Sequence, residues 1–428
     1  MNEKVGVIGL WHLGCVISVS WMKLGYEVVG FDYEKTRVEK LRKGIPPLYE
    51  PNLDKALLEG FEKGLLSFSD NVESLRECDY VFLSYDTPVL DDDTSDTSIL
   101  ENSVKSVRVV MKDSAILIVS SQSPVGYCSH LRYLLKEKNA TLEIAYSPEN
   151  LRLGEAIECY LRPGRIVIGT ASKETELSCV KLFSKITDQL LCMSLESAEI
   201  VKHGINSYLA MSIVFANHLA DICESKSARI DDVVRGLKSD VRIGAKAYLS
   251  PGIGFSGGTL GRDLKVLDSV NESSNGFAKM FGAVHAFNSE RKLSIVSKID
   301  AILGGIAGKT ISILGLTYKP GTSTLRRSLP LEIVEQLVNR NGKVKVYDPK
   351  ADYSELNEPP LFEICKSIDD ASDNCDILVL LTEWDEFKYF DWSKLVSPKN
   401  KKMFFDTKNC LDECNMRKVG FNYYGIGR

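Results

Sequence analysis

Two polar side chains four residues apart, Lys202 and Asn206, are the residues whose types and spacing first suggest a reaction. They lie in a stretch of helical periodicity, so they share one face of a helix. An ammonium and a carboxamide aimed at one point can stabilise an alkoxide, the anion that forms when an alcohol is oxidised. Taken alone, the pair is more typical of a solvated lysine beside a polar neighbour.

A second candidate site is the turn Gly9-Leu-Trp-His-Leu-Gly14, which follows a strand-like run and opens a helix. Unpaired backbone N–H groups at a helix start can bind a pyrophosphate. Trp11 replaces the middle glycine of the usual GxGxxG pattern, but Asp32 ends the next strand. A carboxylate there can accept from both ribose hydroxyls and repels a 2′-phosphate, which favours NAD over NADP. A Rossmann-shaped unit without a dinucleotide is the alternative, and His12 is interpreted as a structural rather than a catalytic residue.

The composition indicates a globular protein of two or three domains. The 428 residues are 44% hydrophobic and 26% charged, ordinary values for a packed chain. The 53 Lys and Arg against 58 Asp and Glu give a formal net charge of −5, which argues against a generic nucleic-acid binder. No apolar run reaches the ~18 residues of a membrane span, and the start lacks the pattern of a secretory signal.

Cysteine and histidine usage points to a reduced compartment without a metal site. The eleven cysteines are scattered and form no CxxC pair, and the five histidines show no metal-ligand spacing. We therefore expect free thiols, a cytoplasmic location and no metal.

Short apolar runs alternate with helical patterns in the first half of the chain. We expect strands at Val5–Gly9, Val28–Asp32, Tyr80–Ser84, Ile116–Ser120 and Arg165–Gly169. Such alternation predicts a parallel sheet with helices on both faces.

The pattern then changes to one long helix, from about Ser197 to Glu224, which is interpreted as a spacer and dimerisation surface, with a simple core helix as the alternative. After Gly304 the opening layout returns, with strands at Lys309–Gly315 and Lys343–Tyr347 and a helix that starts at Leu329–Leu337. We predict an α/β protein with two doubly wound Rossmann-like domains joined by a helical middle. The expected boundaries are 1–195 for the first, NAD-binding domain, 196–300 for the central helical domain and 301–428 for the second Rossmann-like domain.

Ordered motifs along nearly the whole chain resemble the UDP-glucose/GDP-mannose dehydrogenase family. They include, besides the Gly9–Gly14 turn, Glu50-Pro-Asn-Leu53, Asp86-Thr-Pro88, Ser147-Pro-Glu149, Pro163-Gly-Arg-Ile-Val-Ile-Gly169, Ala198-Glu-Ile-Val-Lys202 with Asn206, Arg242-Ile-Gly244, Pro251-Gly-Ile-Gly-Phe255, Gly315-Leu-Thr-Tyr-Lys-Pro320, Thr382-Glu-Trp384 and Gly425-Ile-Gly-Arg428. The resemblance implies oxidation of a sugar C6 alcohol to a carboxylate with two NAD. In the family a cysteine captures the aldehyde formed first, and water hydrolyses the resulting thioester.

The resemblance also implies roles for individual residues. The implied catalytic residues are Lys202, Asn206, Asp263, Thr259 and Glu149. The implied cofactor-binding residues are Gly9, Trp11, His12, Leu13, Gly14, Asp32, Arg37, Thr87, Pro88, Gln122 and Arg326. The implied substrate-binding residues are Leu151, Arg152, Arg242, Tyr248, Phe255, Gly257, Tyr318, Lys319 and Lys408. Arg242 resembles an arginine that reaches the sugar of a neighbouring subunit, so a homodimer is implied. The expected substrate is a nucleotide sugar, with a UDP-hexose preferred.

Several positions depart from the family pattern. The family run Gly-Phe-Gly-Gly-Ser-Cys reads here Gly254-Phe-Ser-Gly-Gly-Thr259, so Thr259 stands in the place of the nucleophilic cysteine. Leu153 replaces a second carboxylate, Gln122 replaces a threonine near the nicotinamide, and Lys408 replaces an arginine. A threonine hydroxyl is far less acidic than a thiol and needs an adjacent base.

Three outcomes therefore stay open at the sequence level. Alcohol-to-aldehyde oxidation needs no cysteine, and a hydrated aldehyde could still give up a second hydride. The alternatives are an oxidoreductase that stops after two electrons, and a silent homologue that binds NAD and sugar nucleotide, either alone or as a structural partner of an active homologue.

Overall fold

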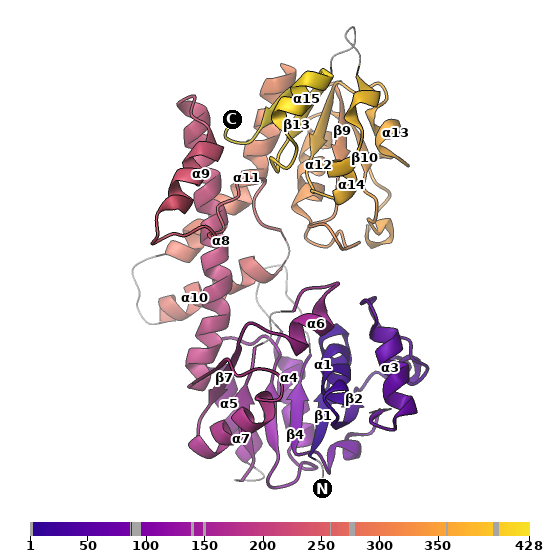
Figure 1. Cartoon of the computed structure of the whole chain (residues 1–428), viewed down its shortest axis with the longest axis vertical. Coiled ribbons are helices and arrows are strands. Elements are labelled where there is room, and N and C mark those ends of the chain that lie inside the picture. The colour runs from indigo at the N-terminus through magenta and orange to yellow at the C-terminus, as the bar shows by residue number, and fades with distance from the viewer. Residues whose placement is uncertain are drawn as a thin grey trace. The chain divides into compact units, whose positions relative to one another are not determined.

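The chain folds into two compact units, residues Met1–Gly204 and Ile205–Arg428. In Figure 1 the colour runs from indigo at the N-terminus, in the first unit, to yellow at the C-terminus, in the second. The computed structural model describes residues 3–85, 87, 96–137, 141–148, 151–256, 258–273, 279–356, 358–396 and 402–428, and only the backbone of 271–273. The predicted three-part division with its boundaries stays a prediction.

Among its described residues, the first unit has an eight-stranded sheet in the order β3-β2-β1-β4-β5-β6-β7-β8. Its strands are β1 (Lys4–Ile8), β2 (Glu27–Phe31), β3 (Leu66–Ser69), β4 (Tyr80–Leu83), β5 (Ile116–Val119), β6 (Glu143–Tyr146), β7 (Ile166–Thr170) and β8 (Leu190–Met193). The five expected strands are present, and each begins and ends within one residue of its predicted bounds. The strands β3, β6 and β8 were not anticipated from the sequence.

The expectation of a parallel sheet is wrong at one place: β7 runs antiparallel to β6. The helix between them, α6 (Ala156–Leu161), has six residues, about 9 Å at 1.5 Å per residue. Such a short helix does not return the chain to the opposite edge of the sheet. The chain therefore re-enters the sheet from the edge at which β6 ended.

Helices cover both faces of this sheet, as a doubly wound fold requires. They are α1 (His12–Lys23), α2 (Lys35–Arg42), α3 (Leu53–Glu62), α4 (Ser98–Val107), α5 (Tyr127–Lys136), α6 and α7 (Lys173–Phe183), with a short 3₁₀ turn at Val72–Leu75. Two separate apolar cores result. One contains Trp21 of α1 and Phe183 of α7, and the other contains Val104 of α4 and Leu131 of α5.

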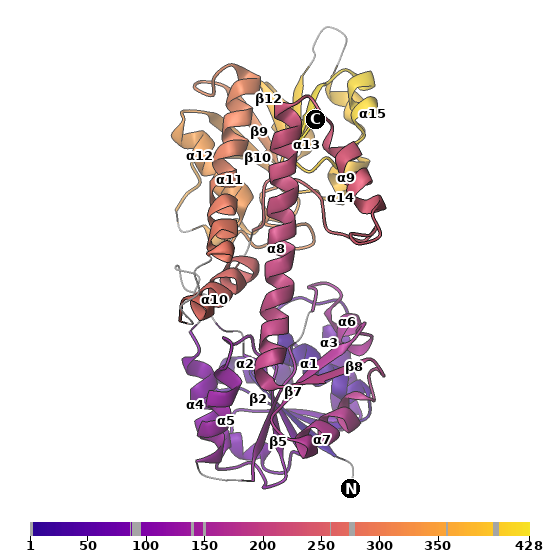
Figure 2. The same cartoon turned by 90° about the vertical axis from the view of Figure 1, so that its left-hand side faces the viewer.

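The long helix expected near 197–224 is α8 (Leu195–Ser225), which Figure 2 shows as one continuous rod. Its first turns pack against the second core of the first unit through Leu195 and Ala198. It continues into the second unit, where α9 (Ile230–Ser239), α10 (Thr259–Ser273) and α11 (Met280–Leu303) follow. The helical middle of the chain is therefore as predicted. None of the helices described is long and apolar enough to cross a bilayer.

The second unit repeats the strand order of the first six strands, as β11-β10-β9-β12-β13-β14. Its strands are β9 (Thr310–Leu314), β10 (Lys343–Tyr347), β11 (Glu363–Ile364), β12 (Ile377–Leu380), β13 (Met403–Asp406) and β14 (Asn422–Gly425). Its helices are α12 (Leu329–Asn339), α13 (Ile368–Ser372), α14 (Asp385–Tyr389) and α15 (Glu413–Val419), with 3₁₀ turns at Tyr353–Glu355 and Trp392–Leu395. The predicted second Rossmann-like unit is confirmed.

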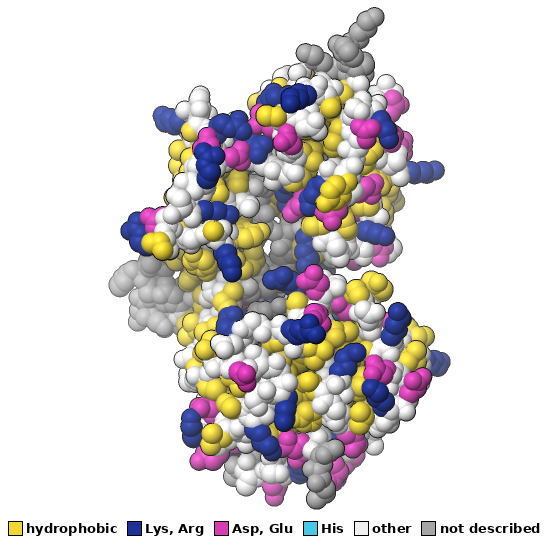
Figure 3. Space-filling model, in the orientation of Figure 1, with side chains coloured by type: hydrophobic (Ala, Val, Ile, Leu, Met, Phe, Trp, Pro, Cys, Tyr) yellow, Lys and Arg dark blue, Asp and Glu magenta, His cyan; other side chains and the backbone are white. Residues whose placement is uncertain are grey.

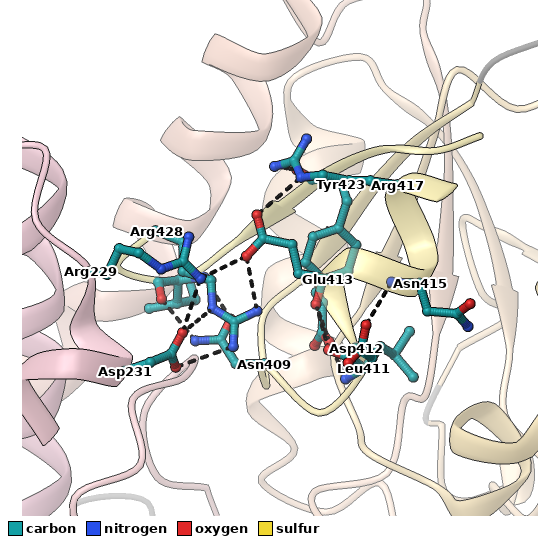
Figure 4. Close-up of polar contacts among 12 residues, drawn as sticks. Arg229, Asp231, Asn409, Leu411, Asp412, Glu413, Asn415, Arg417, Tyr423 and Arg428 are labelled. Carbon is teal, nitrogen blue, oxygen red and sulfur yellow. Dashed lines mark hydrogen bonds and ion pairs between the residues drawn. The ribbon is translucent and has the colours of Figure 1, made fainter. Parts of the chain in front are cut away.

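A polar cluster fixes the end of the chain to α9 (Figure 4). Arg428 pairs with Asp231 at 2.9 Å, and Arg229 pairs with Glu413 of α15 at 2.8 Å. Asn409 binds the backbone of Ile426 with both ends of its carboxamide, at 2.8 and 3.0 Å. These contacts hold β14 against the loop that follows β13. Elsewhere on the face shown in Figure 3, basic and acidic side chains are interspersed.

Candidate active site

The turn between β1 and α1 has the geometry of a pyrophosphate cradle. Gly9 has φ +90°, and its N–H donates to Phe31 O at 3.0 Å. A Cβ at Gly14 would lie 1.9 Å from Gly9 O, so only glycine lets the helix start approach the strand so closely. The unpaired N–H groups at the start of α1 therefore stand directly at the turn.

Asp32, at the end of β2, is buried and already engaged. One carboxylate oxygen accepts from Leu10 N at 2.6 Å and from Arg37 at 2.7 Å, and the other accepts from Glu34 N at 2.9 Å. Three hydrogen bonds from the described residues therefore already occupy this carboxylate, which has about four acceptor positions; that it also accepts from both ribose hydroxyls stays a prediction. With its adjoining Arg37, the site still fits an NAD ribose.

The other residues predicted for the turn differ in exposure. Trp11 is partly exposed, and the Arg37 guanidinium lies 5.3 Å from its ring centre, a cation–π contact. Leu13 is buried. His12 donates from Nε2 to Glu50 at 2.8 Å, and Glu50 also accepts from Gly154 N and Ala156 N. The buried Glu50 thus joins the cofactor turn to the segment that precedes α6.

Four further predicted residues of the first unit, Thr87, Gln122, Leu151 and Arg152, follow β4, β5 and β6 in the chain. Thr87 donates its hydroxyl to Gln122 O at 3.0 Å. Leu151 and Arg152 line a cavity of about 360 Å³ together with Ser120, Ser147 and Arg165. Three predicted site residues, Pro88, Glu149 and Gly257, lie outside the described residues.

The predicted catalytic residues on α8 and α10 are brought together in part. The Asn206 carboxamide donates to Asp263, and both side chains are buried. Thr259 is the exposed first residue of α10, one turn before Asp263, and Lys202 lies one turn before Asn206 on α8. The neighbour Arg262 places its Nε 3.8 Å from Asp263.

The second glycine turn, after β9, carries the predicted nucleotide-binding pair. Gly315 has φ +89° and donates to Tyr347 O at 2.8 Å, as Gly9 does in the first unit. Asp348 repeats the position of Asp32, but its two oxygens accept from Leu316 N, Thr317 N and Oγ1, Trp384 Nε1, Lys350 N and Ala351 N. Beyond this turn the Lys319 ammonium lies 5.5 Å from the ring centre of Tyr318.

Lys408 and Tyr248 share an acidic neighbour. Lys408 pairs with Glu383 at 3.1 Å, and a Cβ at Gly252 would lie 3.8 Å from Lys408 Cδ. Desolvation, and then the charge of Glu383, raises the pKa of Tyr248. The loop that begins at Gly252 therefore lies beside the predicted phosphate-binding lysine.

The last three predicted residues are held in different ways. Phe255 is buried in a small apolar cluster with Ala210 and Leu264. Arg242 is 85% exposed and pairs with Asp240 at 2.7 Å. The exposed Arg326 is held through its backbone N–H, which donates to Thr324 and Glu355.

Three domain patterns of one family match the chain. The UDP-glucose/GDP-mannose dehydrogenase NAD-binding domain matches residues 3–187, the central domain matches residues 196–290, and the UDP-binding domain matches residues 312–413. The chain belongs to the UDP-glucose/GDP-mannose dehydrogenase family.

Relatives of this dehydrogenase family align over the full length. UDP-glucose 6-dehydrogenase of Rickettsia bellii is 33% identical over 433 residues, which cover 99% of both chains. The enzyme of the same name from Rhizobium meliloti is 30% identical, with 99% of both chains covered. A UDP-glucose dehydrogenase structure from Pyrobaculum islandicum has a TM-score of 0.88 at 26% identity and covers 100% of this chain and 98% of that chain.

Family membership makes the chain an NAD-dependent oxidoreductase that acts on the CH–OH group of a nucleotide sugar. The predicted fold, cofactor and enzyme class are confirmed. The reaction at the residue level, the identity of the sugar and the oligomeric state are treated below.

Some residues that shape the site were not identified from the sequence. Glu50 and Glu383 belong to quoted motifs, Glu50-Pro-Asn-Leu53 and Thr382-Glu-Trp384, so their motifs were a usable signal. Asn288, which binds the backbone of Phe255, lies in no quoted motif.

Thr259 has no cysteine near it in the sequence, since none occurs between Cys223 and Cys365. Burial raises the pKa of the Cys223 thiol.

Proposed function

We propose that the chain oxidises the C6 hydroxyl of a UDP-hexose, with UDP-glucose preferred, to the aldehyde and more slowly to the uronic acid. The observation that carries this proposal is the buried Asn206–Asp263 pair, one turn from Lys202 along α8 and one turn from Thr259 along α10. Full-length relatives named UDP-glucose 6-dehydrogenase support the choice of substrate.

Asn206 acts as an oriented donor. Its NH₂ group has two N–H donors. One is used by Asp263, which fixes the plane of the carboxamide and leaves the second for the alkoxide oxygen. The hydroxyl proton passes to solvent water, and the Lys202 ammonium supplies a compensating charge for the alkoxide that it leaves. NAD, when bound, accepts the hydride from C6.

The second oxidation lacks the sulfur of the family route. Thr259 is the residue at the nucleophile position, and its hydroxyl is a poor nucleophile without an adjacent base. Water therefore adds to the aldehyde, and the gem-diol loses a hydride to a second NAD and a proton to solvent, which gives the acid. Because hydration is not assisted by a thiol, we expect some aldehyde to be released.

The substrate-binding residues expected from the resemblance are kept as assignments, each for its own unit. We assign Leu151 and Arg152 of the first unit to the sugar. We assign Phe255, Tyr318, Lys319, Lys408 and Tyr248 of the second unit to the sugar, base and diphosphate. Since Lys408 is paired with Glu383, a bound diphosphate must compete with this carboxylate for the ammonium.

The active form is proposed to be a homodimer that uses the exposed face of α8. Tyr208, Phe215 and Ile222 are spaced seven apart on this helix and are 67%, 51% and 45% exposed. A seven-residue apolar spacing is typical of a helix that packs along a second helix. The exposed Arg242 would then serve the neighbouring subunit.

A cytoplasmic location is proposed as well. All eleven cysteines are free, and scattered free thiols are typical of reducing compartments.

The decisive experiment incubates the purified protein with NAD and a panel of UDP- and GDP-sugars. The NADH formed per sugar consumed is measured, and the product is weighed by mass spectrometry. We expect turnover with UDP-glucose and a ratio between one and two. A ratio of one with aldehyde alone would show a two-electron enzyme, the second candidate that Thr259 favours. No NADH with any sugar would contradict the proposal, and Asn206→Ala serves as the inactive control.

A further inference from the structure

The loop from Gly252 to Gly258 leads directly into α10 and so determines where Thr259 begins that helix. It contains no regular secondary structure in its described residues, yet Gly252, Ile253 and Phe255 are buried. Buried backbone groups outside a helix or sheet need other hydrogen-bond partners. The partners in this loop are side chains from two neighbouring helices.

The Asn288 side chain of α11 hydrogen-bonds both the backbone N–H and the backbone C=O of Phe255 in the loop. Its Oδ1 accepts from Phe255 N at 2.8 Å, and its Nδ2 donates to Phe255 O at 3.0 Å. This is the pattern that a neighbouring strand would provide. A Cβ at Gly254, which has φ +109°, would lie 2.5 Å from Asn288 Oδ1. The carboxamide thus fills the space beside a glycine that cannot carry a side chain.

The start of the loop is held in a similar way. Gly252 N donates to Asn217 Oδ1 of α8 at 2.7 Å, and Arg291 Nε of α11 donates to Gly252 O at 3.2 Å. Arg291 is itself fixed, because its Nη1 binds both oxygens of Asp221 at 2.8 and 2.6 Å. The three side chains Asn217, Asn288 and Arg291, here called the loop clamp, are all buried.

Ser256 connects the same loop to the second glycine turn. Its hydroxyl oxygen accepts from Leu329 N, at the first residue of α12, at 3.1 Å. The preceding Ser328 donates its hydroxyl to Leu316 O, and Leu316 precedes Tyr318 and Lys319 in the turn. Two hydrogen bonds, joined through the Ser328–Leu329 peptide bond, therefore connect Leu316, two residues before Tyr318, to Ser256 in the loop before Thr259.

We propose that Asn288 and Ser256 are positioning residues: Asn288 sets the backbone of the loop that places residue 259, and Ser256 links that placement to the nucleotide-binding turn. The inference rests on the proposed function only for the role of Thr259. The contacts themselves are independent of the reaction.

The test uses Thr259→Cys as the parent, because a thiol at residue 259 reports its own surroundings without any substrate. Alkylation by iodoacetamide is followed at residue 259 by peptide mass, since the chain has eleven other cysteines. The rate is measured across pH 6–10, an interval of about two pH units on either side of a free thiol pKa. A thiol at a helix start has a lowered pKa, so a shifted loop changes both the rate and the pH profile.

The main variant is Asn288→Asp on this parent and on the natural chain. The carboxylate still accepts from Phe255 N, but it cannot donate to Phe255 O. On the Thr259→Cys parent we expect an altered pH profile of alkylation. On the natural chain we expect kcat to fall by about tenfold to a hundredfold, as for a small misplacement of a reacting group. The KM for NAD should stay within about twofold of its value without the Asn288 substitution. The control is Ser289→Ala, the next residue on α11, which is exposed and whose hydroxyl donates to His285 O.

An unchanged alkylation profile together with a kcat within about twofold of the parent would overturn the role of Asn288. Should Asn288→Asp fail to fold, Ser256→Ala decides, because it removes one hydroxyl from a partly exposed residue. We expect Ser256→Ala to lower kcat/KM for the nucleotide sugar by about fivefold, as the loss of a typical neutral hydrogen bond implies, and to change the alkylation of the parent. No change in either would overturn the proposal. If no sugar is ever oxidised, the alkylation data still test the loop and leave only the reaction refuted.

Discussion

At the scale of single residues, Thr259, which we assign to the nucleophile position, controls what product is expected. Thr259 is the exposed first residue of α10, and a threonine hydroxyl is not acidic enough to add readily to an aldehyde. The Asn206–Asp263 pair, in contrast, is hydrogen-bonded and buried. In the proposed mechanism, the residues assigned to the first hydride transfer are therefore separate from the residue on which the second oxidation depends.

A cysteine introduced at residue 259 should increase acid formation. In Thr259→Cys a thiolate can capture the aldehyde before it leaves, so we expect the NADH-per-sugar ratio to rise towards two and free aldehyde to disappear. Both are measured by absorbance and by product mass. Thr259→Ser, which keeps a hydroxyl without the methyl group, should behave like the natural chain. An unchanged ratio in the cysteine variant would contradict a nucleophilic position at residue 259.

At the scale of elements, the strand–turn–helix units at β1–α1 and after β9 depend on close backbone approach. Gly9 and Gly315 have almost the same positive φ and make the same hydrogen bond to the neighbouring strand. The helix start at α1 is packed so closely that Gly14 has no room for a side chain. Such contacts determine where the unpaired N–H groups point.

Gly14→Ala should displace α1 and weaken NAD binding. A Cβ 1.9 Å from Gly9 O must force the helix away, with a loss of stability of about 1–3 kcal/mol, typical of an overpacked core. Calorimetric unfolding and NAD titration measure the two effects. Gly236→Ala in α9 is the matched control, because no atom lies within 4 Å of its added Cβ. That control should be neutral or slightly stabilising, since alanine favours helix by about 1 kcal/mol.

The polar cluster between α9 and α15 should make stability depend on acid. The pKa of Glu413 lies below its usual 4.5, mainly because its carboxylate accepts a hydrogen bond from the Arg229 guanidinium. Partial burial acts in the opposite direction, and Arg417 lowers the pKa further. A lowered folded-state pKa means that the stabilisation is complete above about pH 4.5 and is lost as pH falls through the folded value.

Glu413→Gln should therefore cost about 1–2 kcal/mol at pH 7, as for a hydrogen bond to a charged group. The difference from the natural chain should shrink as pH falls below about 4.5. Urea unfolding at several pH values measures it. A difference that stays constant in acid would show that the charge of Glu413 contributes nothing.

At the scale of the whole molecule, α8 takes part in both units: it packs on the core of the first through Leu195 and Ala198 and carries Asn206 and Asn217 in the second. Its large exposed apolar residues in the second unit repeat every seven positions. We expect Tyr208→Glu combined with Phe215→Glu to yield a particle of one chain in sedimentation, whereas the natural chain forms dimers. Tyr389→Glu, at a residue 85% exposed on α14, should leave the dimer intact. A natural chain that sediments as a monomer would contradict the homodimer.

The elements that follow strong periodicity could be predicted from the sequence. The helix expected at 197–224 is Leu195–Ser225, and the strand expected at Lys343–Tyr347 has these bounds. The antiparallel β7 could not be predicted, because its direction depends on how far the chain travels through α6 after β6. The strand β6, Glu143-Ile-Ala-Tyr146, was missed because it lacks the continuous, mostly β-branched apolar run of the equally short β5, Ile116-Leu-Ile-Val119.

The sequence allowed candidate site residues to be named by their type, but it did not show which side chains they would contact. Asn206 and Asp263 were named separately, and only the fold shows that they bind each other. The ion pair of Lys408 with Glu383 and the clamp residue Asn288 depend on segments far apart in the sequence. No local pattern records such pairings.

The carboxylate of Asp348 has a consequence for which nucleotide the second glycine turn can hold. Within the described residues Asp32 accepts three hydrogen bonds, whereas Asp348 accepts six, one of them from the indole of Trp384. A ribose hydroxyl at the second turn would have to displace one of these donors, so we expect that turn to disfavour a dinucleotide bound as at the first.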